Sequence, residues 1–106
     1  MVREITATEL AARRRAGEEP LVLDVRESWE LAIASLPGVR HIPMNEIPSR
    51  LNELDPQAEV IVLCHRGGRS LQVATFLERR GFVNAVNLAG GIQAWSREVD
   101  PSVSLY

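Results

Sequence analysis

Residues 60–70 read Val-Ile-Val-Leu-Cys-His-Arg-Gly-Gly-Arg-Ser, and this stretch decides the fold that the sequence predicts. Its first four residues are apolar and mostly β-branched, which is typical of a strand buried on both faces of a parallel sheet. The strand ends at Cys64, the only cysteine in the chain. Beyond the two glycines, apolar residues recur at helical spacing from Leu71 to Leu77, and Gly81 predicts the end of that helix. We therefore expect Cys64 at the carboxyl end of a central strand, where open α/β sheets bind their ligands.

The loop from Cys64 to Arg69 has the composition of an anion-binding site. Gly67 and Gly68 adopt positive φ at little cost, so successive backbone N–H groups can converge on one point. The N-terminus of the following helix adds partial positive charge, and Arg66 and Arg69 add full charges. Such a field stabilises a thiolate. We expect Cys64 to be a nucleophile at the floor of this loop.

Polar residues near this loop are candidates for a supporting role. Ser70 either donates a hydrogen bond to the sulfur or caps the helix, and the sequence favours neither. Asp24 follows a second apolar strand, residues 21–23, and its side chain can bind the backbone N–H groups of the next turn. Arg26 and Glu30 stand four residues apart, so they can form an ion pair.

Three further segments accompany this loop in a recognisable order. Residues 21–27 read Leu-Val-Leu-Asp-Val-Arg-Glu, and residues 36–39 read Leu-Pro-Gly-Val and are followed by Ile-Pro at 42–43. Residues 88–95 read Leu-Ala-Gly-Gly-Ile-Gln-Ala-Trp. With the loop, these segments resemble the rhodanese-type sulfurtransferases in their single-domain form, and the resemblance covers nearly the whole chain.

Strands and helical patterns alternate along the chain, which predicts an α/β fold built from βαβ units. The resemblance implies a three-layer α/β/α arrangement around a mostly parallel, five-stranded central sheet. We expect residues 1–106 to form a single domain with a short C-terminal tail at about 101–106. The strands at 21–23 and 60–63 should lie inside the sheet, because they are the most apolar. The resemblance and the permissiveness of glycine together predict that residues 90–91 turn close to the catalytic loop.

Two helix starts and two tryptophans complete the expected fold. Thr6 and Glu9 fit a capping box at the start of a helix that should end near residue 16. Ser28 is expected to cap a second helix that runs to about residue 34. We expect Trp29 and Trp95 to lie in the hydrophobic core.

The composition excludes several classes of function. All 12 side chains in the Lys+Arg count are arginine, which excludes a Walker A phosphate loop and a Schiff-base lysine. One cysteine excludes an intramolecular disulfide, and the two histidines lack the spacing of a zinc site, so we expect no metal and no other cofactor. A net charge of −2 argues against nucleic acid as a partner. No segment approaches the roughly 20 apolar residues of a membrane span, so we expect a cytoplasmic protein. We also expect it to be a monomer or a weak dimer.

The resemblance, together with the size of the loop, predicts sulfur transfer. Four residues separate Cys64 from Arg69, whereas related phosphatases and arsenate reductases resemble C-x5-R, a position that Ser70 occupies here. The shorter loop should accommodate one extra sulfur atom as a Cys64 persulfide. We expect a ping-pong reaction from a small anionic donor, thiosulfate, to cyanide or a thiol. Residues 65–69, His-Arg-Gly-Gly-Arg, would bind the substrate, with His65 at the rim of the site.

Three alternatives stay open from the residues themselves. A lone cysteine is often buried and inert, and the flanking glycines and arginines disfavour this here. A cysteine-dependent phosphatase or arsenate reductase is the enzymatic alternative, and the loop length disfavours it. A non-catalytic sulfur-carrier or recognition module of the same fold is the third alternative. Such modules typically lack the cysteine, whereas this chain has Cys64.

Overall fold

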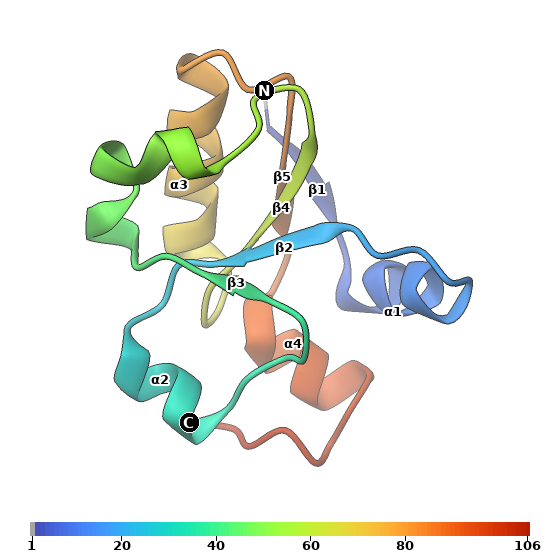
Figure 1. Ribbon diagram of the computed structural model, residues 1–106. Helices are drawn as coiled ribbons and strands as arrows, with labels where there is room; N and C mark the ends of the chain where they lie inside the picture. The colour runs from blue at the N-terminus through green and yellow to red at the C-terminus, as the bar shows by residue number, and fades with distance from the viewer. Residues whose placement is uncertain (1) are drawn as a thin grey trace.

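The computed structural model describes residues 2–106, which contain a five-stranded sheet with parallel pairing throughout (Figure 1). The strand order is β1-β5-β4-β2-β3, which confirms the expected parallel, five-stranded sheet. The elements, with η for 3-10 helices, are β1 (Arg3–Ile5), α1 (Ala7–Arg15), β2 (Leu21–Asp24), α2 (Ser28–Ile33), β3 (Arg40–His41), η1 (Met44–Glu46), η2 (Pro48–Glu53), β4 (Glu59–Leu63), α3 (Gly68–Arg79), β5 (Asn84–Leu88) and α4 (Gly91–Glu98).

The central strand is β4, which directly precedes Cys64. Its residue Ile61 is in register with Val22 of β2 on one side and with Val86 of β5 on the other. The expectation that residues 21–23 and 60–63 lie inside the sheet is therefore confirmed, and β5 is a third interior strand. Because the strands are parallel, their carboxyl ends gather at one edge of the sheet.

Alternate residues of β4 pack into two separate hydrophobic clusters, which form the two interfaces of a three-layer fold. Ile61 and Leu63 belong to the cluster that includes residues of α1 and α4, among them Trp95. Val60 and Val62 belong to the cluster that includes residues of α3, η1 and η2. Figure 1 shows the helices on the two sides of the sheet accordingly. The expected three layers and the core position of Trp95 are confirmed.

The helix starts match the sequence in one case and differ in the other. The capping box of α1 is present: the Glu9 N–H donates to Thr6 Oγ1 at 3.1 Å, and the Thr6 N–H donates to Glu9 Oε1 at 2.9 Å. The expected cap of α2 was wrong, because Glu27 is the N-cap and Ser28 is the first helical residue. The Glu27 N–H donates to Glu30 Oε2 at 2.9 Å, so the carboxylate of Glu30 gives this backbone N–H at the start of the helix its hydrogen-bond acceptor.

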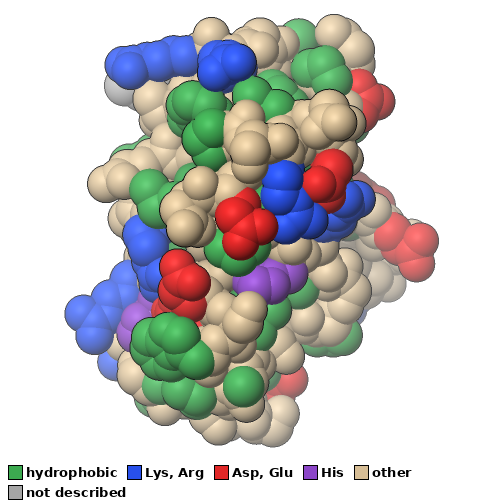
Figure 2. All heavy atoms as spheres, turned by 60° about the vertical axis from the view of Figure 1, so that its left-hand side comes forward, with side chains coloured by type: hydrophobic (Ala, Val, Ile, Leu, Met, Phe, Trp, Pro, Cys, Tyr) green, Lys and Arg blue, Asp and Glu red, His purple; other side chains and the backbone are tan. Residues whose placement is uncertain are grey.

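The expected core position of Trp29 was also wrong, because this side chain is 62% exposed. Helix α2 has only six residues and lies beyond the carboxyl end of β2, not over a face of the sheet (Figure 1). One side of α2 therefore faces solvent. Figure 2 shows exposed hydrophobic side chains at the lower end of the molecule, where Figure 1 places α2 and the C-terminus.

Acidic and basic side chains lie side by side near the middle of the face that Figure 2 shows. The ion pairs Arg40–Glu53, Arg50–Glu46 and Arg50–Glu53 connect η1, η2 and β3.

Within residues 2–106, no helix is long and apolar enough to cross a membrane.

Candidate active site

Cys64 lies between the end of β4 and the start of α3, at the carboxyl edge of the sheet. Gly67 is the N-cap of α3 with φ of +108°, a conformation that favours glycine. This turn directs the Gly67 N–H at Cys64 Sγ, at 3.0 Å. The N–H groups of the first turn of α3 have no acceptor within the helix, so they add positive potential beside the sulfur. Cys64 itself is only 1% exposed.

The turn at Gly90 and Gly91 holds the loop from the neighbouring strand. The N–H of Ile92 donates to the Cys64 carbonyl oxygen at 2.9 Å, and the N–H of Gln93 donates to the His65 carbonyl oxygen at 3.1 Å. A Cβ atom on Gly91 would lie 2.5 Å from both carbonyl oxygens, which is too close for any other residue. The expectation that this turn approaches the catalytic loop is therefore confirmed.

A chain of polar side chains leads from the buried sulfur to the exposed residue Glu4. The Cys64 thiol donates to Ser70 Oγ at 3.2 Å, and the Ser70 hydroxyl donates to Asn87 Oδ1 at 2.5 Å. Asn87 Nδ2 donates to Glu4 Oε2 at 2.7 Å and to the Gly67 carbonyl oxygen at 3.3 Å. Ser70 therefore contacts the sulfur and does not cap the helix, whose N-cap is Gly67.

Asp24 and Arg26 form an ion pair beneath the loop in which both side chains are fully buried. Arg26 Nη2 donates to Asp24 Oδ2 at 2.7 Å, and the Arg26 backbone N–H donates to Asp24 Oδ1 at 3.1 Å. The second bond is the expected role of Asp24 in the turn. The expected pair of Arg26 with Glu30 was wrong, because the guanidinium of Arg26 turns back to Asp24 and to the Ala34 carbonyl oxygen.

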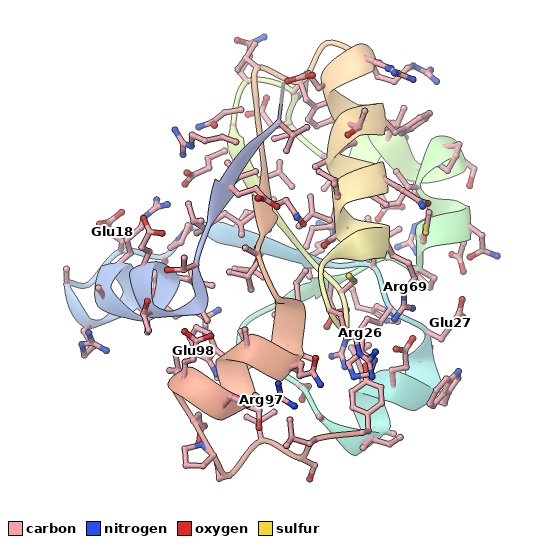
Figure 3. The ribbon with its side chains drawn as sticks, turned by 180° about the vertical axis from the view of Figure 1, so that it is seen from behind. Glu18, Arg26, Glu27, Arg69, Arg97 and Glu98 are labelled. Carbon is pink, nitrogen blue, oxygen red and sulfur yellow. The ribbon has the colours of Figure 1, made fainter. Side chains whose placement is uncertain are left out.

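Glu30 instead holds Arg69 of the loop. The two Nη atoms of Arg69 donate to the two carboxylate oxygens of Glu30, each at 2.8 Å. Figure 3 shows Arg69 near the N-terminal end of α3, and Glu27 at the turn that leads into α2. The bond from Arg69 lowers the pKa of the Glu30 carboxyl from an ordinary 4.5 to about 2. Glu30 is 3% exposed and therefore carries a buried negative charge next to the anion-binding loop.

Arg66 and His65 complete the loop on its outer side. Arg66 is exposed, and its side chain has no hydrogen bond or ion pair with the residues that the structure describes. His65 is partly buried, with its ring stacked on Tyr106 at a centroid distance of 4.0 Å. Burial, followed by the charge of Arg66, lowers the pKa of His65 below its ordinary 6.5. His65 is therefore neutral at pH 7.

Three residues of this site were absent from the sequence-based candidates: Glu30 as the partner of Arg69, Asn87 and Tyr106. Asn87 had a signal in the sequence, since it is a polar residue between the apolar residues of β5. Glu30 fits a helix start but carries no local mark of a long-range partner. Tyr106 lies 76 positions from Glu30 and 41 positions from His65, and no local pattern connects them.

The comparisons with known proteins agree with this architecture. The model of the rhodanese-like domain family matches residues 6–98. A sulfurtransferase of Allochromatium vinosum is 36% identical over 104 residues, which cover 98% of this chain and 97% of that protein. The chloroplastic rhodanese-like/PpiC domain-containing protein 12 of Arabidopsis thaliana is 40% identical over 112 residues, which cover 99% of this chain and 38% of the relative.

A solved structure shows the same fold along the whole chain. The crystal structure of a rhodanese-like domain protein from Staphylococcus aureus superimposes with a TM-score of 0.86 at 31% identity and covers 99% of each chain. The family match, the sequence identities and the shared three-layer fold lead to one conclusion: the chain belongs to the rhodanese-like domain family.

Proposed function

We propose that this protein is a sulfurtransferase that carries a sulfane sulfur as a persulfide on Cys64, with thiosulfate as donor. The observation that carries the proposal is the position of Cys64 Sγ, which accepts the Gly67 N–H at 3.0 Å at the N-terminal end of α3. Membership of the rhodanese-like family supports the same reaction class. We also propose that residues 1–106 act as a single domain.

The first half-reaction transfers sulfur to the enzyme. The Cys64 thiolate attacks the outer sulfur of thiosulfate and forms a new S–S bond. The S–S bond within thiosulfate breaks, and its electron pair leaves with sulfite. The persulfide keeps one negative charge on its outer sulfur, next to the first-turn N–H groups of α3. Preorganised donors of this kind contribute about 3 kcal/mol each where charge develops.

The second half-reaction returns the enzyme to its starting state. Cyanide or an external thiolate attacks the outer sulfur, the persulfide S–S bond breaks, and the electron pair returns to Cys64 as thiolate. The products are thiocyanate or a persulfide of the acceptor. Because the chain has a single cysteine, no internal thiol can resolve the intermediate, so the acceptor comes from outside. A reducing compartment such as the cytoplasm would supply such thiols.

The side chains around the sulfur have separate proposed roles. Arg66, exposed and without a partner within residues 2–106, is proposed to bind the sulfonate oxygens of the donor and the departing sulfite. Arg69 is proposed to add positive potential from a fixed position, since Glu30 holds it. Ser70 has one proton, which it can donate either to Asn87 or to a sulfur anion, so it can follow the charge state of Cys64. Asp24 supports the turn beneath them.

The loop length supports sulfur transfer over phosphate-ester hydrolysis. Only four residues separate Cys64 from Arg69, and the next position is Ser70, whose hydroxyl lies 3.2 Å from Cys64 Sγ. A tetrahedral oxyanion centred on the sulfur needs the longer C-x5-R loop. A single added sulfur atom is smaller, and the Gly67 N–H already donates to Cys64 Sγ, to which that atom would be bonded.

Intact-mass measurement of the purified protein after incubation with thiosulfate tests the proposal directly. We expect a gain of one sulfur atom that cyanide or a reducing thiol removes. The matched control is Cys64→Ser, which should gain nothing because its hydroxyl is a much weaker nucleophile. If the unchanged protein gains no sulfur, the persulfide mechanism is wrong, and turnover of an aryl phosphate becomes the next measurement.

A further inference from the structure

The C-terminal tail returns to the active site although it lies beyond residues 6–98, which the family model matches. Its middle is anchored to α4, because Ser96 Oγ donates to the Val103 carbonyl oxygen at 2.5 Å. The side chain of Val103 packs against the hydrophobic cluster that α1 and α4 share. From this anchor the chain runs to α2, where Figure 1 shows the C-terminus. The tail therefore brings its last residue, Tyr106, to the edge of the sheet that carries Cys64.

The hydroxyl of Tyr106 connects the two ion pairs of the site. It accepts a hydrogen bond from Arg26 Nη1 at 2.9 Å and donates one to Glu30 Oε1 at 2.8 Å. Arg26 is held by Asp24 beneath the loop, and Glu30 holds Arg69 within the loop. One phenolic group thus joins a fully buried, rigid pair to the pair that positions the loop cation.

The ring of Tyr106 contacts the other end of the loop. It stacks on His65 with an interplanar angle of 7° and a centroid distance of 4.0 Å. The edge of the ring meets Trp29 of α2 at a centroid distance of 6.3 Å. The ring therefore covers the residue that directly follows Cys64, while the hydroxyl contacts Glu30, the partner of Arg69.

We propose that Tyr106 is a positioning residue for anion binding at Cys64, which holds Arg69 in place through Glu30 and holds the loop backbone through His65. The proposal rests on the proposed function only for its kinetic test. The tail is then part of the active site and not only a cover for the hydrophobic core. Loss of the hydroxyl should weaken the attraction of the loop for anions, and loss of the ring should in addition open the side of the loop next to Cys64.

The kinetic test compares Tyr106→Phe, Tyr106→Ala and the control Leu105→Ala in the thiosulfate assay. Leu105 is 55% exposed and lies in the same tail, outside the contacts described above. For Tyr106→Phe we expect the KM for thiosulfate to rise about fivefold with little change in kcat, which is the size of effect expected for the net loss of one ordinary hydrogen bond. Tyr106→Ala should raise KM further. Leu105→Ala should match the unchanged protein.

A second readout does not depend on sulfur transfer. Cys64 is the only cysteine, so the alkylation rate of the whole protein is the rate at this thiol. Iodoacetate carries a negative charge and iodoacetamide does not, so the ratio of their rates measures the attraction of the site for anions. We expect Tyr106→Phe to lower this ratio about threefold. Tyr106→Ala should also raise the rate with iodoacetamide, because the ring no longer covers the loop.

The outcomes separate the two proposals. If both tyrosine variants keep the KM and the alkylation ratio of Leu105→Ala while only their melting temperatures fall, Tyr106 has a purely structural role and the inference is wrong. If the unchanged protein transfers no sulfur, the proposed function is wrong, and the alkylation ratio still decides the role of Tyr106. Melting temperatures above the assay temperature show that each variant is folded.

Discussion

Arg66 and Arg69 look alike in the sequence, since they flank the same two glycines, but the structure gives them opposite surroundings. Arg69 donates two hydrogen bonds of 2.8 Å to a carboxylate that is nearly buried. Arg66 extends into solvent, with no side-chain partner among residues 2–106. One arginine is a fixed, charge-compensated part of the loop, and the other is a free cation.

This difference suits the proposed function, in which a small loop keeps its shape and still attracts an anion. A guanidinium that must keep a loop in shape needs a geometric partner, and a bidentate carboxylate supplies one. That partner offsets part of its charge at a distance. In the proposed reaction, most of the attraction for a donor would then come from the second, unpaired arginine and from the first turn of α3. The two roles are therefore divided between Arg69 and Arg66.

The largest expected effect is on stability and comes from Arg69→Ala. This substitution leaves the Glu30 carboxylate, which is 3% exposed, without its cation. We expect the free energy of unfolding to fall by about 3 kcal/mol, because a buried charge without its partner is strongly destabilising. Arg66→Ala should change it by less than about 0.5 kcal/mol. Urea unfolding of both variants measures the difference, and equal losses would contradict the division of roles.

The next largest effect is expected on the stability of the folded protein at low pH, and the substitution Glu30→Gln tests it. The pKa of the Glu30 carboxyl is about 2 in the folded protein, below the ordinary 4.5 that applies after unfolding. The unfolded chain therefore binds this proton first as the pH falls, and the stabilisation present above pH 4.5 is lost progressively towards pH 2. Arg69 is 36% exposed, so solvent screening limits what the charge of Glu30 contributes to the free energy of unfolding to about 2 kcal/mol.

Urea unfolding of the unchanged protein and of Glu30→Gln as a function of pH measures this contribution. The variant should lack the part of the acid-dependent loss that belongs to Glu30. Glu53→Gln is the matched control, because Glu53 also pairs with arginine but lies on the surface, where screening weakens the pair. If the control changes the acid profile as much as Glu30→Gln does, burial at the site has no special role.

Arg66→Ala is expected to have the smallest effect on stability, but a clear effect on the binding of thiosulfate. The KM for thiosulfate should rise about fivefold while kcat falls less, because a free cation contributes mainly to donor binding. The pKa of His65 should rise towards its ordinary 6.5, because the charge of Arg66 helps to lower it. Steady-state kinetics and NMR titration of His65 measure the two changes. Arg79→Ala, an exposed arginine in the last turn of α3, controls for net charge, and an unchanged KM in Arg66→Ala would refute its role.

Much of the site could be predicted because its signals are local. The strand 60–63, the two glycines and the helix after them are consecutive, so β4, the loop and α3 follow from residue order alone. The glycine pair at 90–91 was also readable, since a residue without a Cβ indicates a close approach of backbone. The errors were of another kind. Ser28, Trp29 and the pair of Arg26 with Glu30 were all assigned from the local sequence in and just before one short helix, and α2 makes its decisive contacts outside itself.

The sequence alone determined the alternation of strands and helices, the position of Cys64 at the end of an apolar strand and the cationic loop, because these depend on neighbouring residues and on hydrophobic burial. Only the tertiary structure decided which carboxylate holds Arg69, which polar residue contacts Ser70 and which aromatic ring stacks on His65. These contacts join β5, α2 and the C-terminal tail to the loop and the start of α3 across 17, 39 and 41 positions of the chain. Side-chain hydrogen bonds act over about 3 Å, so such partners exist only after the hydrophobic layers have brought the elements together.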